Sequence, residues 1–333
     1  MRAILFVVGV ALVAPAPGGA PAEWRPLTTE LLAREKTGFG GLCGVVVERS
    51  TGRLFVDLSD RGLFTSADRG ATWTRVENSP PKGRTETPGC LQIDPTGKTP
   101  RLLMPLVYGS PIAVGSTGGG PWRVLDKAST HVDWCAADWG DPDLKFLLAL
   151  KHEANGLLLR SRDGGKTFDD LGKGHGPAWV FDATTAVVTR VKTKDNPKGG
   201  VVRTADGGAT FAPVADFTPT ALPRVGPDGV YWLADGGLHK TTDGGKTWAK
   251  VGVVKDGRYG PVFGTDAKQL FVLTGAGVVE STDAGKTWAA PVAVPAALKG
   301  VSALTWLDYD PTSDTLYLMK MGSELYARRR GGP

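Results

Sequence analysis

The sequence predicts an all-β protein built as a β-propeller, and three observations carry that prediction. An eight-residue pattern, Ser/Thr-x-Asp-x-Gly-x-Thr-Trp/Phe, occurs at residues 66–73, 161–168, 204–211, 241–248 and 281–288. The repeat distance is close to forty residues, and each unit holds four short apolar segments, which is typical of propeller blades. The 46 glycines and 24 prolines among 333 residues suit a chain with many tight turns.

We call this pattern the box motif, and its residue types have a physical logic. A turn Asp accepts hydrogen bonds from backbone N–H groups two or three residues further on. The Gly supplies a positive φ that other residues resist, and the aromatic residue packs between neighbouring sheets. A degraded copy at residues 116–122 keeps the glycines and the Trp but lacks the Asp. A structural role is therefore expected for the five box aspartates, Asp68, Asp163, Asp206, Asp243 and Asp283.

On these residues the chain resembles the Asp-box (BNR) repeat proteins over nearly its whole expected mature length. That group includes sialidases, xyloglucan-degrading enzymes, sortilin-type receptors and the photosystem II assembly factors. The resemblance implies that each box lies in the hairpin between the two outer strands of a blade. It also implies that the boxes occupy the face of the propeller away from the ligand.

Residues 1–22 are expected to form a signal peptide. A single Arg precedes an apolar run over residues 3–14, and Ala20-Pro21-Ala22 provides a small-residue cleavage site. The apolar run is short for a bilayer span. The sequence thus predicts export to the periplasm or the extracellular space after cleavage near Ala22, with an uncleaved anchor as the alternative. No later segment is expected to cross a membrane.

Residues 23–333 are expected to form one domain of seven blades. In the first unit, strands are expected at residues 44–48, 53–57, 62–65 and 72–76, and the next five units repeat this order. A helix of one or two turns is expected within residues 27–36. Six blades, with the region 85–125 merged into its neighbours, is the alternative.

The last unit contains only three strand segments, at residues 301–308, 315–320 and 324–328. Residues 23–27 resemble the strand that follows each box. We therefore expect the N-terminal strand to complete the last blade, which closes the ring and removes exposed sheet edges.

The chain is mildly basic, with a formal net charge of +5 and a pI near 9.0. Its only concentrated run of basic residues is Arg328-Arg329-Arg330, which is expected to be a solvated cluster. Nucleic-acid binding requires a basic face with interleaved aromatic residues. The sequence predicts no nucleic-acid partner, and a monomer.

Cys43, Cys90 and Cys135 are spaced by 47 and 45 residues, so they fall at equivalent places on the first strands of three successive blades. Three interpretations stay open: small residues in a crowded core, a disulfide, or a three-thiolate metal site. No metal and no cofactor is expected elsewhere.

The ligand face of such a propeller is formed by two sets of loops, which lead into the first strands and join the two middle strands. We call it the upper face. The candidate ligand- or partner-binding residues are Arg84, Glu86, His131, Asp133, Trp134, Arg224, Arg258 and Tyr259. Arg84, Arg224 and Arg258 are expected to form a basic face.

The sequence favours a non-catalytic scaffold that binds a protein or a glycan on this face. The photosystem II assembly factors, which are exported single-domain propellers that bind a membrane-protein partner, resemble this chain most closely in plan. A sialidase-like glycoside hydrolase is the alternative, since sialidases use three arginines, a Tyr and two carboxylic acids. The chain lacks the Arg-Ile-Pro motif of that family, and its catalytic residues are unknown.

Overall fold

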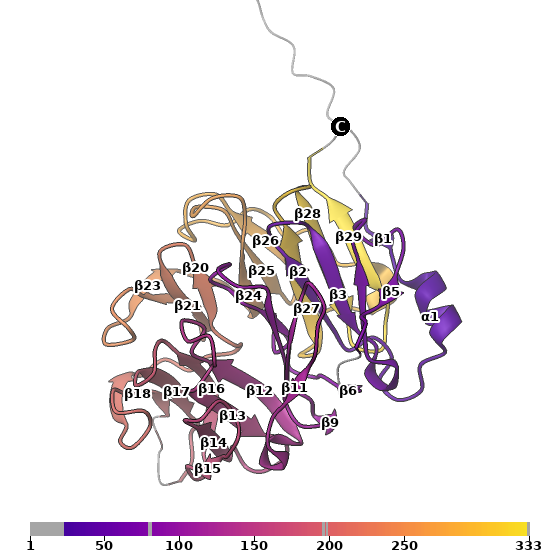
Figure 1. Cartoon of the computed structure of the whole chain (residues 1–333). Helices are drawn as coiled ribbons and strands as arrows, with labels where there is room; N and C mark the ends of the chain where they lie inside the picture. The colour runs from indigo at the N-terminus through magenta and orange to yellow at the C-terminus, as the bar shows by residue number, and fades with distance from the viewer. Residues whose placement is uncertain (1–22, 79–81, 195–196, 198, 332–333) are drawn as a thin grey trace, which may run out of the picture.

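The computed structural model describes residues 23–78, 82–194, 197 and 199–331 (Figure 1). Seven small antiparallel sheets form the blades of a β-propeller. The predicted fold class and the count of seven blades are confirmed, and the six-blade alternative is wrong. The region 85–125 forms a blade of its own, because its strands pair with one another and not with a neighbouring sheet. The expected signal peptide lies outside the described residues.

The first three blades follow the chain in order. Blade 1 consists of β2 (Gly44–Glu48), β3 (Arg53–Asp57), β4 (Leu63–Ser66) and β5 (Thr74–Arg75). Blade 2 consists of β7 (Gln92–Ile93), β8 (Arg101–Met104), β10 (Ala113–Ser116) and β11 (Arg123–Val124). Blade 3 consists of β12 (Val132–Ala137), β13 (Leu147–Lys151), β14 (Leu158–Ser161) and β15 (Asp169–Asp170).

The next three blades repeat this order. Blade 4 consists of β16 (His175–Val180), β17 (Ala186–Arg190), β18 (Gly200–Thr204) and β19 (Ala212–Ala215). Blade 5 consists of β20 (Arg224–Gly226), β21 (Gly229–Ala234), β22 (Gly237–Thr241) and β23 (Ala249–Gly252). Blade 6 consists of β24 (Gly257–Phe263), β25 (Leu270–Thr274) and β26 (Gly277–Ser281). Its outer edge carries a single bridge between Val278 and Val292.

Short elements complete the chain outside the blades. A two-stranded ribbon joins β6 (Gly83–Arg84) and β9 (Tyr108–Gly109) next to blade 2. The helix α1 (Thr29–Glu35) falls where one or two helical turns were expected. Single 3₁₀ turns occur at η1 (Ser59–Arg61), η2 (Lys127–Ser129) and η3 (Ala296–Leu298). Among the described residues, no helix has the length and apolarity needed to cross a membrane.

Blade 7 closes the ring as the sequence predicted. It consists of β27 (Thr305–Asp310), β28 (Thr315–Lys320), β29 (Leu325–Arg329) and β1 (Arg25–Pro26). The strand β1 pairs with β29, and beyond it the Leu27 N–H donates to the Leu325 carbonyl at 2.8 Å. The two ends of the described chain therefore lie side by side in one sheet (Figure 1).

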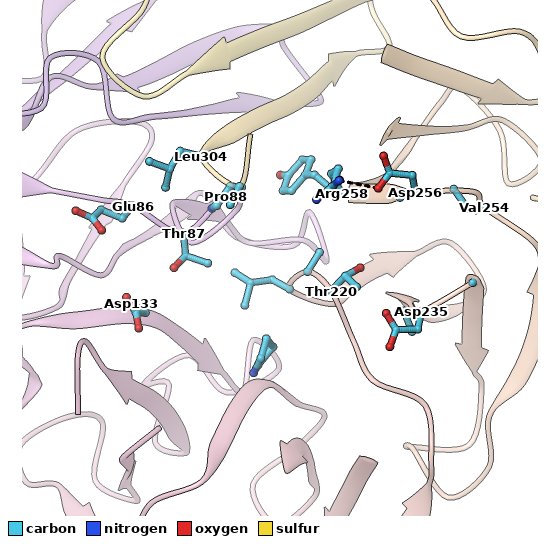
Figure 2. A pocket seen from close by; sticks show the side chains of 18 residues that line it. Glu86, Thr87, Pro88, Asp133, Thr220, Asp235, Val254, Asp256, Arg258 and Leu304 are labelled. Carbon is cyan, nitrogen blue, oxygen red and sulfur yellow. Dashed lines mark ion pairs between the residues drawn. The ribbon is translucent and has the colours of Figure 1, made fainter. Parts of the chain in front are cut away.

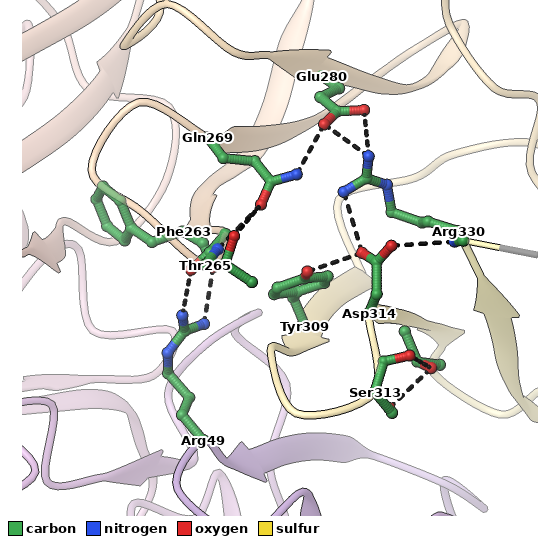
Figure 3. A network of polar contacts seen from close by, with 12 residues as sticks. Arg49, Phe263, Thr265, Gln269, Glu280, Tyr309, Ser313, Asp314 and Arg330 are labelled. Carbon is green, nitrogen blue, oxygen red and sulfur yellow. Dashed lines mark hydrogen bonds and ion pairs between the residues drawn. The ribbon is translucent and has the colours of Figure 1, made fainter.

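The C-terminal arginines were expected to be solvated, and for Arg330 this is wrong. Figure 3 shows its guanidinium held by Glu280 of blade 6, at 2.7 and 2.8 Å, and by Asp314 of blade 7 at 3.2 Å. Its side chain is only 19% exposed. Nearby, Arg49 of blade 1 donates to the carbonyls of Phe263 and Gly264, each at 2.8 Å. These contacts connect blade 1 with blade 6 and blade 6 with blade 7, next to the point where the ring closes.

The five box turns share one hydrogen-bond pattern. In each, one carboxylate oxygen of the Asp accepts from the Ser or Thr hydroxyl two residues earlier and from the backbone N–H of the Thr four residues on. The other oxygen accepts from that Thr hydroxyl. The bonded amides therefore lie further along the chain than the two or three residues expected, although the amides of Lys166 and Ala209 are bonded three residues on. The box glycines have φ between 76° and 91°, as predicted.

Candidate functional site

The principal cavity lies on the upper face, where the innermost strands begin. Its volume is about 540 Å³. Six blades contribute to its wall, because the loop before the innermost strand of blades 2, 5, 6 and 7 and the beginning of that strand in blades 3 and 4 all reach it. The loop between the two middle strands of blade 5 adds Asp235 and Gly236. A cavity of this size suits a small ligand or a short stretch of peptide.

Acidic side chains dominate the charge of this cavity. Among the described lining residues, Glu86, Asp133, Asp235 and Asp256 carry carboxylates, and Arg258 carries the one guanidinium. Figure 2 shows Glu86 and Asp133 on one side of the opening and Asp235 and Asp256 on the other. Apolar side chains that include Pro88, Leu222, Val254 and Leu304 also line the cavity. The cavity thus offers apolar surface with a net negative rim.

Four of the eight candidate residues line this cavity, namely Glu86, Asp133, Arg258 and Tyr259. The exposed Arg258 pairs with Asp256 at 2.8 Å, so a neighbouring carboxylate balances its charge. Tyr259 is 3% exposed, and the guanidinium of Arg224 lies 4.7 Å from the centre of its ring. Tyr259 therefore presents only a small part of its surface to the cavity.

The expected basic face of Arg84, Arg224 and Arg258 does not form on the cavity, because only Arg258 lines it. The Arg84 guanidinium is 4.0 Å from the centre of the Phe39 ring and 4.7 Å from that of Tyr108, and it pairs with Glu86. Arg224 lines a second, deeper cavity of about 70 Å³ between innermost strands. Its Nε is buried without a hydrogen-bond partner in the described part of the chain.

Trp134 also lies in the interior and not on the upper face. Its side chain is 1% exposed and contributes to the wall of the deeper cavity, next to Cys135. The pairing of β12 with β13 shifts register between Val132 and Trp134, so Asp133 lies at a β-bulge, which can turn a side chain in a different direction from those of the regular strand. Of this pair, Asp133 is the residue that reaches the principal cavity.

The last candidate, His131, lies at the edge of the upper face among other polar side chains. It immediately precedes β12, and its Nδ1 is 2.7 Å from the Val107 carbonyl oxygen. Its ring meets that of His152 edge to face, with centres 4.9 Å apart and planes at 89°. The Nδ1 of His152 lies 2.7 Å from Asp133, which connects this edge to the principal cavity.

The three cysteines are free and buried, so the disulfide interpretation is wrong and core packing fits. Cys135 lies in the innermost strand β12 as the spacing predicted, whereas Cys43 lies one residue before β2 and Cys90 two residues before β7. Burial raises the pKa of all three thiols. A metal site needs thiolates, which such burial disfavours.

Several residues of the upper face escaped the sequence analysis. His152 and Glu153 follow β13, and Asp235 follows β21, so all three belong to loops that join middle strands. The sequence assigns those loops to the ligand face as a class, but no repeated pattern distinguishes their individual residues. Asp256 stood two residues before Arg258, and an acidic residue at that distance was a usable signal.

No family model matches the sequence, and no curated protein matches it. Among solved structures, the chain is similar to YCF48 bound to a D1 peptide, with 16% identity and a TM-score of 0.53 over 96% of this chain and 98% of that chain. YCF48 from Cyanidioschyzon merolae gives 13% identity and a TM-score of 0.52, with 93% and 99% covered. The Cps50 (Swd1) β-propeller domain from Myceliophteria thermophila gives 9% identity and a TM-score of 0.60, with 89% and 98% covered. At these identities the similarity shows the propeller fold alone.

Proposed function

We propose that this chain is an exported, monomeric, non-catalytic propeller that binds a segment of a protein partner in the principal cavity. The observation that carries the proposal is the cavity itself, with a volume of about 540 Å³ and walls from six blades. Loops on a rigid scaffold are where binding residues concentrate. A ring of loops around one depression gives a partner many contact points, and binding of this kind requires no catalytic group.

The charge of the cavity indicates the kind of segment it binds. Of the four lining carboxylates, Glu86 pairs with Arg84 and Asp256 pairs with Arg258, so Asp133 and Asp235 are the two without an arginine partner among the described residues. Complementary charge steers association and selects the partner. We infer that the preferred segment carries a Lys or Arg side chain flanked by apolar residues, which would contact Leu222, Val254 and Leu304.

The fold neighbours support a protein partner over a glycan. One of the similar solved structures is YCF48 bound to a D1 peptide, a propeller of nearly the same extent as this chain. That protein is a precedent for peptide binding by this fold. The identity of 16% leaves the peptide that this chain binds to be determined from its own cavity.

The arginine positions weigh against the sialidase-like alternative. A sialidase clamps the substrate carboxylate with three arginines, and of Arg84, Arg224 and Arg258 only Arg258 lines the cavity. The cavity's acidic rim also opposes binding of an anionic sugar, because like charges repel. Hydrolysis of fluorogenic sialosides by the purified chain, abolished by Tyr259→Phe, would establish the hydrolase instead.

The proposal is tested with two fluorescein-labelled peptides of equal length and apolar content, one carrying Lys and Arg and the other Glu. We expect the basic peptide to bind more tightly by fluorescence anisotropy, and the double variant Asp235→Asn/Asp256→Asn to weaken it several-fold. Glu77→Gln changes an exposed carboxylate outside the described cavity lining and should leave binding unchanged. Equal affinity for the two peptides, or no binding of either, would contradict the proposal.

A further inference from the structure

Two histidines and a glutamate meet at the edge of the upper face on blade 3. His131 precedes β12, and His152 and Glu153 follow β13. The two strands are antiparallel, with Val132 opposite Lys151, so the beginning of one and the end of the other lie together. One potential ligand atom from each of the three residues lies within 4.8 Å of the other two.

Both imidazole rings are oriented by a hydrogen bond at Nδ1. The Nδ1 of His131 is 2.7 Å from the Val107 carbonyl oxygen, and that of His152 is 2.7 Å from an oxygen of Asp133. A carbonyl or carboxylate oxygen can only accept, so each Nδ1 donates and each neutral ring keeps its lone pair on Nε2. Histidine ligands of metals show this arrangement, in which the outer partner fixes the tautomer and the ring orientation.

We propose that His131 Nε2, His152 Nε2 and the Glu153 carboxylate bind a divalent transition-metal ion of the Zn²⁺ class. Two imidazole nitrogens and one carboxylate oxygen are a donor set that Zn²⁺ accepts, with bonds of about 2.0–2.2 Å in tetrahedral geometry. Such bonds require donor atoms about 3.4 Å apart. The His152 Nε2 and a Glu153 oxygen are already 3.7 Å apart.

Glu153 must move closer to the ring nitrogens to bind the metal, and its side chain is free to move. Glu153 is 73% exposed, whereas the side chain of His152 is 16% exposed and fixed by Asp133. Because Glu153 is exposed, rotation about its side-chain bonds is free to move its carboxylate toward the ring nitrogens. The nearby ammonium of Lys151 is bound to the carbonyls of Ala128 and Thr130.

Three protein ligands leave a fourth position on the metal for water or for a donor atom of a bound molecule. Asp133 lines the principal cavity and also orients His152, so the metal site and the cavity share one residue. The metal site does not depend on the proposed peptide binding, and each can fail alone.

The competing explanation is aromatic packing without a metal. The Tyr108 ring contacts both imidazoles edge to face, with centres 5.1 Å from His131 and 5.8 Å from His152. Packing alone does not require a carboxylate beside the Nε2 of His152, and it predicts no metal affinity. A direct titration distinguishes the two explanations.

The test uses the full chain, purified without a histidine tag and treated with a chelator. Isothermal titration calorimetry with ZnCl₂ should show one binding site. Co²⁺, a spectroscopic substitute for Zn²⁺, should give the visible absorption bands of tetrahedral coordination. His131→Gln and His152→Gln should each weaken Zn²⁺ binding more than 10-fold, and Asp133→Asn about 10-fold through loss of ring orientation.

His239→Gln is the matched control, because it removes a histidine that stacks on Phe217 in blade 5, away from the site. It should bind Zn²⁺ like the original chain, and circular dichroism should show all variants folded. Absence of Zn²⁺ binding, or equal binding by His131→Gln, His152→Gln and the original chain, would overturn the proposal.

Discussion

The carboxylates on the two faces of this propeller have opposite electrostatic surroundings. In the box turns, hydrogen bonds from the Thr247 hydroxyl and amide lower the pKa of Asp243 to about 2. Beneath the upper face, burial raises the pKa of Asp57 to about 7, although Thr85 donates to it at 3.0 and 3.1 Å. The same residue type thus stabilises the fold in one region and is costly to ionise in the other.

The difference follows from how each region is built. A box turn encloses its Asp with donors from its own eight residues, so every copy is satisfied locally. Asp57 depends on a donor from the next blade, and its Oδ1 has no hydrogen-bond partner within the described residues. Each repeated box turn therefore supplies the hydrogen bonds of its own Asp. Asp57 instead belongs to no repeated motif and depends on residues from another part of the chain.

The largest expected effect is on the pH dependence of stability and comes from Asp57. Between about pH 4 and pH 7, this carboxyl ionises in the unfolded chain but stays protonated in the folded one, so stability falls as the pH rises, by about 1.4 kcal/mol per unit. Asp57→Asn should remove that decline, measured as the free energy of unfolding in urea at several pH values. A decline equal to that of the original chain would show that Asp57 is ionised in the fold.

A smaller loss is expected at the box face from Asp243→Ala. Removing the acceptor of three turn hydrogen bonds should cost about 1–2 kcal/mol at neutral pH, as for the loss of a helix cap. The folded pKa of about 2 lies below the usual value, so the contribution is complete above about pH 4 and is lost as the pH falls toward 2.

The neighbouring Thr242→Ala provides the control for the box turn, since it changes an exposed side chain of the same turn. Urea titrations of both variants at pH 7 and pH 2.5 separate the two contributions. If Asp243→Ala were as stable as Thr242→Ala at pH 7, the hydrogen bonds of the turn would contribute nothing to the fold.

The sequence predicted most of the fold because the fold repeats. Five intact boxes located the blades, and the resemblance of residues 23–27 to the strand after each box predicted the closing strand, which pairs with β29. Arg330 was misjudged because its partners, Glu280 and Asp314, are 50 and 16 residues away, and no local pattern connects them.

The site was predicted only in part, for two physical reasons. Asp133 and Trp134 are neighbours, but Asp133 lies at a β-bulge in the pairing of β12 with β13, and it reaches the cavity whereas Trp134 lies in the core. A shift of one residue reverses that assignment, and the sequence does not fix it. His152 and Asp235 reach the upper face through loops between middle strands, where no repeated pattern distinguishes a binding residue from a turn residue.

The smallest effect on stability, with a clear effect on binding, is expected from Arg258→Glu. Arg258 and its partner Asp256 are about half exposed, so the pair should contribute at most about 1 kcal/mol to folding. The substitution replaces the one guanidinium among the described lining residues with a fifth carboxylate. It should strengthen binding of the basic peptide and steepen the dependence of that binding on salt concentration, since charge attraction that salt screens drives the association.

Lys255→Glu makes the same charge change at an exposed residue outside the described lining, and a gain as large in that variant would assign the effect to net charge and not to the cavity. Weaker binding by Arg258→Glu would instead mean that the guanidinium contacts an anionic group of the ligand, which would restore the basic-face hypothesis.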